Sequence, residues 1–309
     1  MGEIIIALIQ GILLVLLAPL VSGVTRWFRA KMHTRKGPSI WQDYYDIAKL
    51  FKRQDVHSNQ SSFISRLMPP LFMGTMIVLA MGMPMMTRLC PIPLLGDAIL
   101  IIYMLALPRF FFALAGIDSG SSYAGIGSVR ELVVGTLVEP SLMLALFVAA
   151  LSCGTTNIGV MGQMVASGQC ANPIAMSLAG IAFAAACYIE LGKLPYDLAE
   201  AEQELQEGPL QEYSGPSLAM MHLAMPMKQI IVVSWLVAIF LPFGSAVDLS
   251  LTGLLFGALF FVLKVAVIFF ICGIIENVVC RVRFKLTSRQ TWFVLAIAVC
   301  AFAFCVLGI

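Results

Sequence analysis

The acidic segment from Glu190 to Tyr213 is the stretch of this apolar chain whose residues are best suited to chemistry. It carries seven of the seventeen acidic residues, namely Glu190, Asp197, Glu200, Glu202, Glu204, Glu207 and Glu212. If a helix begins near Pro195, four of them fall at steps of three, four and three, on one stripe. Crowded carboxylates that leave bulk water bind protons more tightly and titrate together, which is the behaviour that a proton relay needs.

Two interpretations of the acidic segment stay open. It could be a solvated acidic loop, or a helix whose like charges, which repel by roughly a few tenths of a kcal/mol per pair, are compensated from outside. Gly208 and Pro209 are expected to end this helix, because Gly is favoured after a helix and Pro cannot continue one. Arg281 and Arg283, in the last loop, are the bases expected to neutralise the stripe.

Three further charged residues, Arg109, Glu139 and Lys264, lie inside long apolar runs. A charged side chain at the centre of a membrane helix costs roughly 2.5 to 3.5 kcal/mol, so each is expected to face an opposite charge or a hydrated cavity. Glu139, which precedes Pro140, is expected to be an interior carboxylate. The three residues either form a charged line across the bilayer or are structural ion pairs.

The composition that surrounds these charges is that of a polytopic membrane protein. Of the 309 residues, 60% are hydrophobic and 12% are charged, whereas about a quarter of the residues of soluble domains are charged. Eight apolar runs approach the ~20 residues that a helix needs to cross hydrocarbon: 4–22, 69–87, 99–115, 132–152, 173–189, 230–247, 249–275 and 291–309. We therefore expect one all-α membrane domain, residues 1–309, with about eight transmembrane helices.

The basic residues are distributed unevenly between the two sides of this expected bundle. Of the nineteen Lys and Arg residues, all but Arg88, Arg109 and Lys264 lie in the odd-numbered loops. Because positive charge stays on the cytoplasmic side, both termini are expected outside, and segments 25–66, 116–131, 191–229 and 276–290 in the cytoplasm. The net charge of +2 reflects this imbalance and does not indicate a nucleic-acid-binding surface.

The first cytoplasmic segment contains an amphipathic pattern. Trp41, Tyr44, Ala48 and Phe51 share one face of an expected helix, which either lies on the lipid surface or is a docking platform for a soluble partner. The segment from Asp118 to Arg130 is rich in Gly and Ser, and is expected to be a loop packed against another surface.

The eight cysteines do not have the spacing of a metal site. They include no Cys-x-x-Cys pair and mostly lie in or beside apolar runs, whereas zinc and iron–sulfur sites need clustered thiolates. We interpret them as small apolar residues of a helical bundle, and we expect no metal or other cofactor in this chain.

Four blocks of the sequence resemble the family of the complex I H subunit, an eight-helix protein that connects the soluble arm of respiratory complex I to its membrane arm. The first block is Arg35-Lys36-Gly37-Pro38 with Asp46 and Lys49, and the second is Arg130 with Glu139 nine residues later. The third and most specific runs from Glu190 through Lys193, Pro195-Tyr196-Asp197 and the later acids to Glu212-Tyr213, and the fourth is Arg281 with Arg283.

Departures from the complex I pattern resemble another branch of this family. Ser39 follows Pro38 where complex I members have a longer loop with a second Gly-Pro, and Leu191-Gly192-Lys193 replaces their Thr-Asn-Arg. Residues 204–215, and the Phe triplet at 110–112 before Asp118, resemble the branch found in group-4 membrane-bound nickel–iron hydrogenases such as formate hydrogenlyase. The altered Gly-Pro loop counts against quinone binding.

The resemblance implies a non-catalytic subunit in the bacterial inner membrane that anchors and couples a hydrogenase complex. Its implied partners are a [NiFe] large subunit and an iron–sulfur small subunit, which hold the metal centres, together with antiporter-like membrane subunits. The residues expected to relay protons are Glu139, Glu190, Asp197, Glu200, Glu202, Glu204, Arg109 and Lys264. The residues expected to dock partners or pair charges are Arg26, Arg29, Arg35, Lys36, Asp46, Lys49, Arg130, Lys193, Glu207, Glu212, Tyr213, Arg281 and Arg283. The alternatives are a purely structural anchor without a relay and a quinone-binding subunit, as in complex I.

Overall fold

The structure, a computed structural model, describes residues 2–58, 60–247 and 250–308, apart from the side chains of Glu202, Gln203 and Leu251. Eight helices in this part of the chain are long and apolar enough to span a membrane: α1 (Gly2–Met32), α3 (Phe63–Gly82), α4 (Ala98–Asp118), α5 (Ser122–Cys153), α7 (Pro173–Glu190), α9 (Gly215–Phe240), α10 (Leu251–Val278) and α11 (Phe284–Leu307). The predicted all-α membrane fold with eight spanning helices is therefore confirmed.

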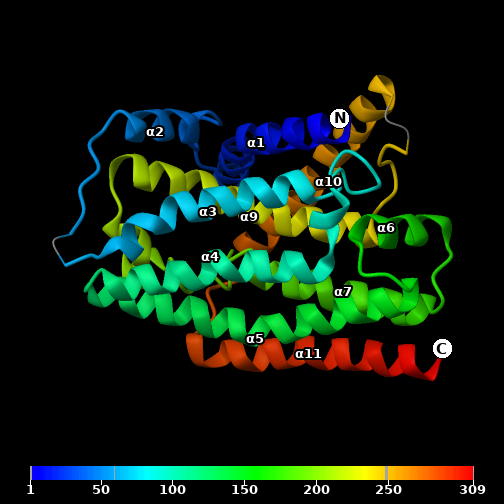
Figure 1. Cartoon of the computed structure of the whole chain (residues 1–309). Helices are drawn as coiled ribbons and strands as arrows, with labels where there is room; N and C mark the ends of the chain where they lie inside the picture. Colours follow the sequence, from blue (N-terminus) through cyan, green and yellow to red (C-terminus); the bar gives the residue numbers. More distant parts are fainter. Residues whose placement is uncertain (1, 59, 248–249, 309) are drawn as a thin grey trace.

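The shorter elements lie at the two ends of the bundle (Figure 1). They are α2 (Gln42–Phe51), η1 (Pro93–Gly96), α6 (Ile158–Ser167), α8 (Glu202–Leu205) and η2 (Gly208–Glu212). Both termini lie at the end that carries α6, and α2 lies at the opposite end. This arrangement agrees with termini on one side of the membrane.

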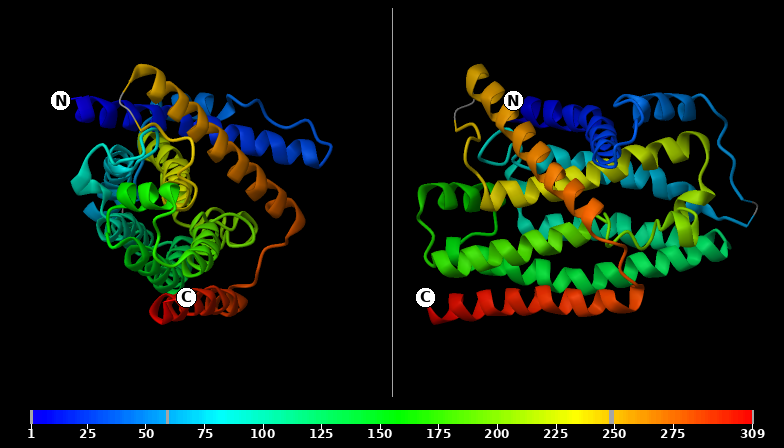
Figure 2. Two further views of the ribbon diagram at one scale, coloured as in Figure 1. Left: turned by 90° about the vertical axis from the view of Figure 1, so that its right-hand side faces the viewer. Right: turned by 180° about the vertical axis from the view of Figure 1, so that it is seen from behind.

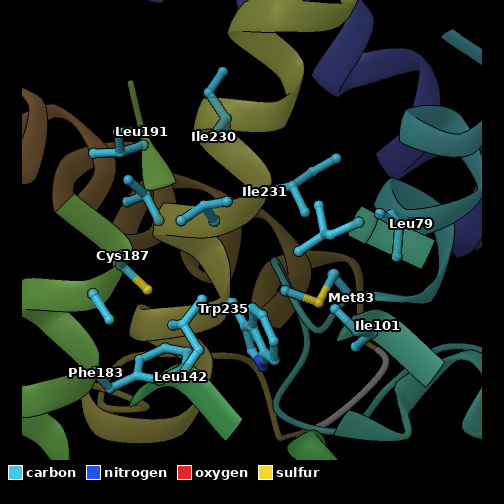
Figure 3. Close-up of a cluster of buried hydrophobic side chains, with 14 of the residues drawn as sticks. Leu79, Met83, Ile101, Leu142, Phe183, Cys187, Leu191, Ile230, Ile231 and Trp235 are labelled. Carbon is cyan, nitrogen blue, oxygen red and sulfur yellow. The ribbon is translucent and has the colours of Figure 1, made fainter. Parts of the chain in front are cut away.

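The spanning helices form one bundle, in which α4, α5, α7 and α9 lie around the middle and α11 packs on α5 and α7 (Figure 1). Helix α10 crosses the outside of the bundle obliquely and contacts α1 and α9 (Figure 2). The core is apolar: Trp235 of α9 and Phe183 of α7 meet edge to face with ring centroids 5.2 Å apart, and Met83, Ile101 and Leu142 lie around them (Figure 3). These helices provide the rigid frame for the charged residues.

The prediction of a helix from Pro195 is wrong. Residues 191–201 form turns, α8 is a single turn, and Gln206 and Glu207 have positive φ angles of 49° and 71° that interrupt any helix. Gly208 and Pro209 begin η2 instead of ending a helix, and Pro is tolerated in the first turn of a helix because the N–H groups there have no partner within the helix. The physical reason is tertiary, because Leu198, Ala199, Leu205 and Leu210 are buried. One helix with a carboxylate stripe does not bury these apolar side chains.

The prediction of a Gly/Ser-rich loop from Asp118 to Arg130 is also wrong, because only residues 119–121 connect α4 to α5. Its small residues instead permit close helix packing, as in many membrane bundles. A Cβ on Gly116 would lie 1.8 Å from Ser128 Oγ, and one on Gly127 would lie 2.9 Å from the Ala199 carbonyl oxygen. Likewise α9 begins at Gly215, well before the apolar run at 230–247, so Lys228 lies inside a helix.

The predicted amphipathic helix is present as α2, and it packs on α1 and α9. Its buried side chains are Asp43 and Ile47, whereas Trp41 and Phe51 of the predicted aromatic face are exposed. Tyr44 of the same face is half-buried and donates a hydrogen bond to the Leu16 carbonyl oxygen of α1. Only Trp41 and Phe51 of the predicted aromatics are therefore exposed to lipid or another protein.

Candidate functional site

Five charged side chains from four helices form a continuous series of ion pairs that alternate in sign. Arg109 of α4 contacts Glu139 of α5 and Glu190 at the end of α7. Lys228 of α9 places its Nζ 3.0 Å from a carboxylate oxygen of Glu190 and 3.5 Å from one of Glu131 of α5. The order is therefore Glu139, Arg109, Glu190, Lys228, Glu131, and we call these residues the charge series. Burial of such charges is tolerated because each has a partner of opposite sign.

Glycine at position 135 makes room for the central member of the charge series. A Cβ on Gly135 of α5 would lie 2.5 Å from Nη1, 2.6 Å from Cδ and 2.8 Å from Cζ of Arg109. Such distances are far below van der Waals contact, so only Gly allows the guanidinium to lie against α5 here. The local sequence of α5 thus fixes where Arg109 lies between its two carboxylates.

The charge series runs from a buried centre to the side of the bundle. The side chain of Arg109 is 7% exposed and that of Glu190 is 5% exposed, whereas that of Glu139 is 36% exposed. Glu139 thus presents part of its carboxylate on the flank of α5, within a span, where hydrocarbon solvates charge poorly. A neighbouring polypeptide with a polar group would satisfy this position.

A small cavity connects the charge series to the acidic segment. It measures about 60 Å³, and its lining includes Arg109, Glu131, Glu190 and Lys228 of the charge series together with Asp197 and Glu200 of the acidic segment. Because one water molecule needs roughly 10–15 Å³ of cavity volume, this cavity has room for a few water molecules. Water there could join the carboxyl group of Glu200 to the charge series by hydrogen bonds.

A second, larger cavity of about 960 Å³ lies beside the first, between α1, α2, α9, α10 and the acidic segment. Asp197 and Glu200 line both cavities, so they lie at the boundary between the two. The wall of the larger cavity also includes Arg26, Arg29 and Lys49, together with several acids. Apolar side chains such as Ile47, Leu210 and Leu218 complete the wall, so the larger cavity has a mixed polar and apolar lining.

Cations from other segments compensate much of the acidic wall. Arg281 Nη2 lies 2.8 Å from Asp197 Oδ2, and Arg130 Nη1 lies 2.7 Å from Glu204 Oε2. Further pairs join Arg26 to Asp43, Arg29 to Glu276 at 3.2 Å and Lys193 to Glu276 at 3.5 Å. The acidic segment is thus held by Arg130 of α5 and Arg281 of the last loop, while the bases of α1 pair with acids of α2 and α10 in the same wall.

Among the acids that line the two cavities, Glu200 shows the clearest rise in pKa above the ordinary value of a carboxyl group. Burial of its carboxyl group raises its pKa to about 8, and the nearby charges of Asp197 and Glu131 add to the shift, while Lys228 opposes it. By contrast, the hydrogen bond from Arg130 lowers the pKa of the exposed Glu204. Glu200 therefore holds its proton at neutral pH and can release it when the charge around it changes.

The structure does not bring every predicted site residue to this place. Lys264 of α10 donates a hydrogen bond of 2.6 Å to the Leu241 carbonyl oxygen just beyond the end of α9, and the nearest charge that acts on it is Arg88. It therefore caps a helix C-terminus at the other end of the bundle, where a cation is favourable, and does not join Arg109 and Glu139.

Several predicted docking residues lie on the surface of the α2 end or within it. Arg35, Lys36, Lys49, Asp46, Glu207 and Arg283 are exposed, Glu212 is half-buried and Tyr213 is buried. The side chain of Glu202 lies outside the part of the chain that the structure describes. Among the described residues, no group of three His, Cys, Asp or Glu side chains is arranged to hold a metal ion.

Sequence reasoning missed Lys228 and Glu131 as members of the site. The apolar runs begin at Leu132 and Ile230, so Glu131 and Lys228 fall at the ends of the expected cytoplasmic segments 116–131 and 191–229 and not inside a helix. The available signal was Gly215-Pro216, a pair typical of a helix start, because a helix from there places Lys228 deep among Met and Ile residues. A buried lysine then requires an acidic partner.

Comparisons with known proteins agree with the resemblance seen in the sequence. A family model described as NADH dehydrogenase matches residues 4–307. The chain is 48% identical over 306 residues to hydrogenase-4 component C of Escherichia coli (strain K12), a match that covers 99% of this chain and 97% of the relative. It is 43% identical to formate hydrogenlyase subunit 4 of the same organism, with 96% of both chains covered.

More distant relatives have the same architecture. The H subunit of NADH-quinone oxidoreductase from Wolbachia sp. subsp. Brugia malayi (strain TRS) is 28% identical, over 84% of this chain and 82% of the relative. A chain in the solved structure of the membrane-bound sulfane sulfur reductase, an archaeal respiratory membrane complex, superposes with a TM-score of 0.87 at 23% identity, over 99% of this chain and 100% of that chain. The chain therefore belongs to the NADH dehydrogenase family, as a multi-pass membrane protein of the kind that includes hydrogenase-4 component C and the H subunit of complex I.

Proposed function

We propose that this chain is a non-catalytic subunit of a membrane-bound [NiFe] hydrogenase that anchors the soluble electron-transfer subunits and relays protonation changes to antiporter-like membrane subunits. The names of the relatives at 43% and 48% identity support the hydrogenase assignment. The observation that carries the relay is the charge series from Glu139 to Glu131, which adjoins a water-sized cavity with Glu200 in its wall.

The physical basis of the relay is electrostatic coupling between Glu200 and the charge series. With a pKa near 8, Glu200 is protonated in roughly nine of ten molecules at pH 7. A positive charge that arrives above the acidic segment favours release of this proton, and a negative charge favours its retention. Because Lys228 and Glu131 act on the same carboxyl group, a change at Glu200 alters the charge series as well.

The same proposal gives each end of the bundle a role. The α2 end carries the basic and acidic residues that would seat a soluble partner, and the excess of Lys and Arg there supports a cytoplasmic location for this end. Both termini and α6 would then face outward from the bacterial inner membrane. The [NiFe] centre and the iron–sulfur clusters would belong to the partner subunits.

Paired substitutions in the purified complex test the relay against a purely structural anchor. Glu139→Gln keeps the size and a hydrogen-bonding group but removes the charge at the exposed end of the series. Glu3→Gln, an exposed acid near the N-terminus, is the matched control. In proteoliposomes, Glu139→Gln should abolish the effect of an ion gradient on hydrogen output while the soluble subunits still copurify, and Glu3→Gln should change neither.

The two hypotheses differ in how activity is lost. A structural anchor predicts that Glu139→Gln loses activity only when the soluble subunits dissociate, so activity per assembled complex stays the same. If assembled Glu139→Gln complexes respond to the gradient as the wild type does, the relay is wrong and the anchor remains.

A quinone-binding subunit is the second candidate, and the size of the larger cavity favours it. Its volume of about 960 Å³ falls within the roughly 300–1,000 Å³ of small-molecule sites. The many charged residues in its mixed wall count against this, because small-molecule sites have only a few polar groups among mostly apolar ones. Inhibitors that block quinone sites separate the two, since they should leave hydrogen turnover unchanged if the cavity holds water.

A further inference from the structure

Two cysteines meet at the end of the bundle that carries both termini. Cys153 is the last residue of α5, and Cys170 lies in the connector between α6 and α7. Their Sγ atoms are 3.8 Å apart. Independently, the backbone N–H of Ala171 donates to the carbonyl oxygen of Ser152 at 3.1 Å, so the two backbones run side by side at this level. Side-chain and backbone contacts thus agree that the cysteines are neighbours.

We propose that Cys153 and Cys170 are a disulfide-forming pair that covalently joins the α6–α7 connector to α5. A disulfide requires the two sulfurs to approach to about 2.05 Å on backbones roughly 4.4 to 6.8 Å apart at Cα. The hydrogen bond between their neighbours Ser152 and Ala171 holds the two backbones close together at this point. Since the sulfurs are already 3.8 Å apart, we expect side-chain rotation and a small shift of the connector to close the remaining gap.

The compartment supports oxidation of this pair. Among the bases in loops, Arg88 alone lies at this end of the bundle, so the charge distribution assigns the end to the outer side of the membrane. Thiols on that side meet protein disulfide oxidants, whereas cytoplasmic thiols are kept reduced. The cysteine proposal depends on this orientation and not on the proton relay.

The reaction is a thiol–disulfide exchange in two steps. Cys170 is partly exposed and Cys153 is buried, so Cys170 is the group that an external oxidant reaches. The Cys170 thiolate attacks one sulfur of the oxidant's disulfide, which forms a mixed disulfide and releases one oxidant thiolate. Cys153 then attacks Cys170 Sγ and releases the second thiolate. Two electrons pass to the oxidant, and the two protons end on its thiols or in water.

The bond would close a loop that contains α6, which packs against α9. A Cβ on Gly162 of α6 would lie 2.3 Å from the Ala238 carbonyl oxygen, so this packing is close. A covalent link from the α6–α7 connector to α5 would therefore hold α6 against α9 as well. Cys305 is a natural control, because its sulfur lies 3.8 Å from Ser152 Oγ but is not paired with either cysteine.

Counting thiols in the full chain in native membranes tests the pair. Membranes are denatured in an alkylating reagent with and without prior reduction, and the alkyl groups are counted by mass. Wild type should gain two groups on reduction, Cys170→Ser and Cys153→Ser should gain none, and Cys305→Ser should still gain two. Because Cys170 lies in a connector, its variant keeps the test valid even if Cys153→Ser fails to fold.

Two results would overturn the proposal. One is a wild-type chain that gains no group on reduction, even after the membranes are treated with oxidised glutathione from the outer side. The other is loss of the gain in Cys305→Ser, which would assign the bond to a different pair. Peptide mapping of the non-reduced chain should show residues 153 and 170 linked.

Discussion

Gly135 is the position where a single methyl group should disturb the charge series most directly. The Cβ of Gly135→Ala would lie 2.5 to 2.8 Å from three atoms of Arg109. Non-bonded carbon atoms pack at about 3.5 Å or more, so the guanidinium must move by roughly 1 Å. A shift of that size alters its contacts with both Glu139 and Glu190.

The cost of the clash in Gly135→Ala can be separated from the effect of helix propensity by the same substitution at a second helix glycine that has free space around it. Overpacking of this kind costs about 1–3 kcal/mol, whereas Ala in place of Gly in a helix interior gains about 1 kcal/mol. Gly74 of α3 also lies within a spanning helix, and a Cβ there meets nothing within 4 Å. Gly74→Ala should therefore gain the stability that Ala gives a helix, with no steric clash. Its free energy of unfolding should exceed that of Gly135→Ala by about 1–3 kcal/mol.

Reversible unfolding in mixed detergent measures the stability of the two variants, and gradient-dependent hydrogen output measures coupling. We expect Gly135→Ala to be less stable than Gly74→Ala and to lose coupling, while Gly74→Ala retains it. Equal stability and equal coupling in the two variants would refute the view that Arg109 is held in place against α5.

Two further predictions concern acid–base behaviour and the limits of the site. The pKa of Glu200 rises from 4.5 in the unfolded chain to about 8, so the folded state binds more protons between these values and stability falls as pH rises through this window. Glu200→Gln should remove that fall, as measured by unfolding at pH 5 and pH 8. Lys264→Met should cost about 0.3–1 kcal/mol of stability by removing a helix C-terminal cation, and should leave coupling unchanged in the proteoliposome assay.

Hydropathy predicted the spanning helices because eight separate runs of apolar residues each match the thickness of a membrane. It misplaced the ends of α5 and α9 because polar and small residues at those ends are buried by other segments of the chain, as Gly127 is by the backbone at Ala199. The prediction of a helix in the acidic segment failed for a similar reason. Its apolar residues Leu198 and Leu205 pack inward, and no periodicity along the sequence reveals that preference.

The site itself was predictable in its members more than in its connections. Arg109 and Glu139 were recognisable because a charge in an apolar span must find a partner. The charge series continues through Glu190 to Lys228 because four helices meet at this place. The spacing of residues within one helix does not reveal how helices meet. Lys264 shows the converse, because an equally isolated charge can be satisfied by a backbone carbonyl at a helix end.

The net charge of the charge series suggests why Glu200 is placed beside it. With every member ionised, three carboxylates face two cations, which leaves one excess negative charge in a region of low dielectric. An uncompensated charge there is costly, and one proton from outside would cancel it. In the proposed relay that proton comes from Glu200, whose pKa is raised to about 8 and which lines the same cavity as Lys228 and Glu131. Glu200 and the charge series would then hold one proton between them, and a partner's charge above the acidic segment would decide on which side it lies.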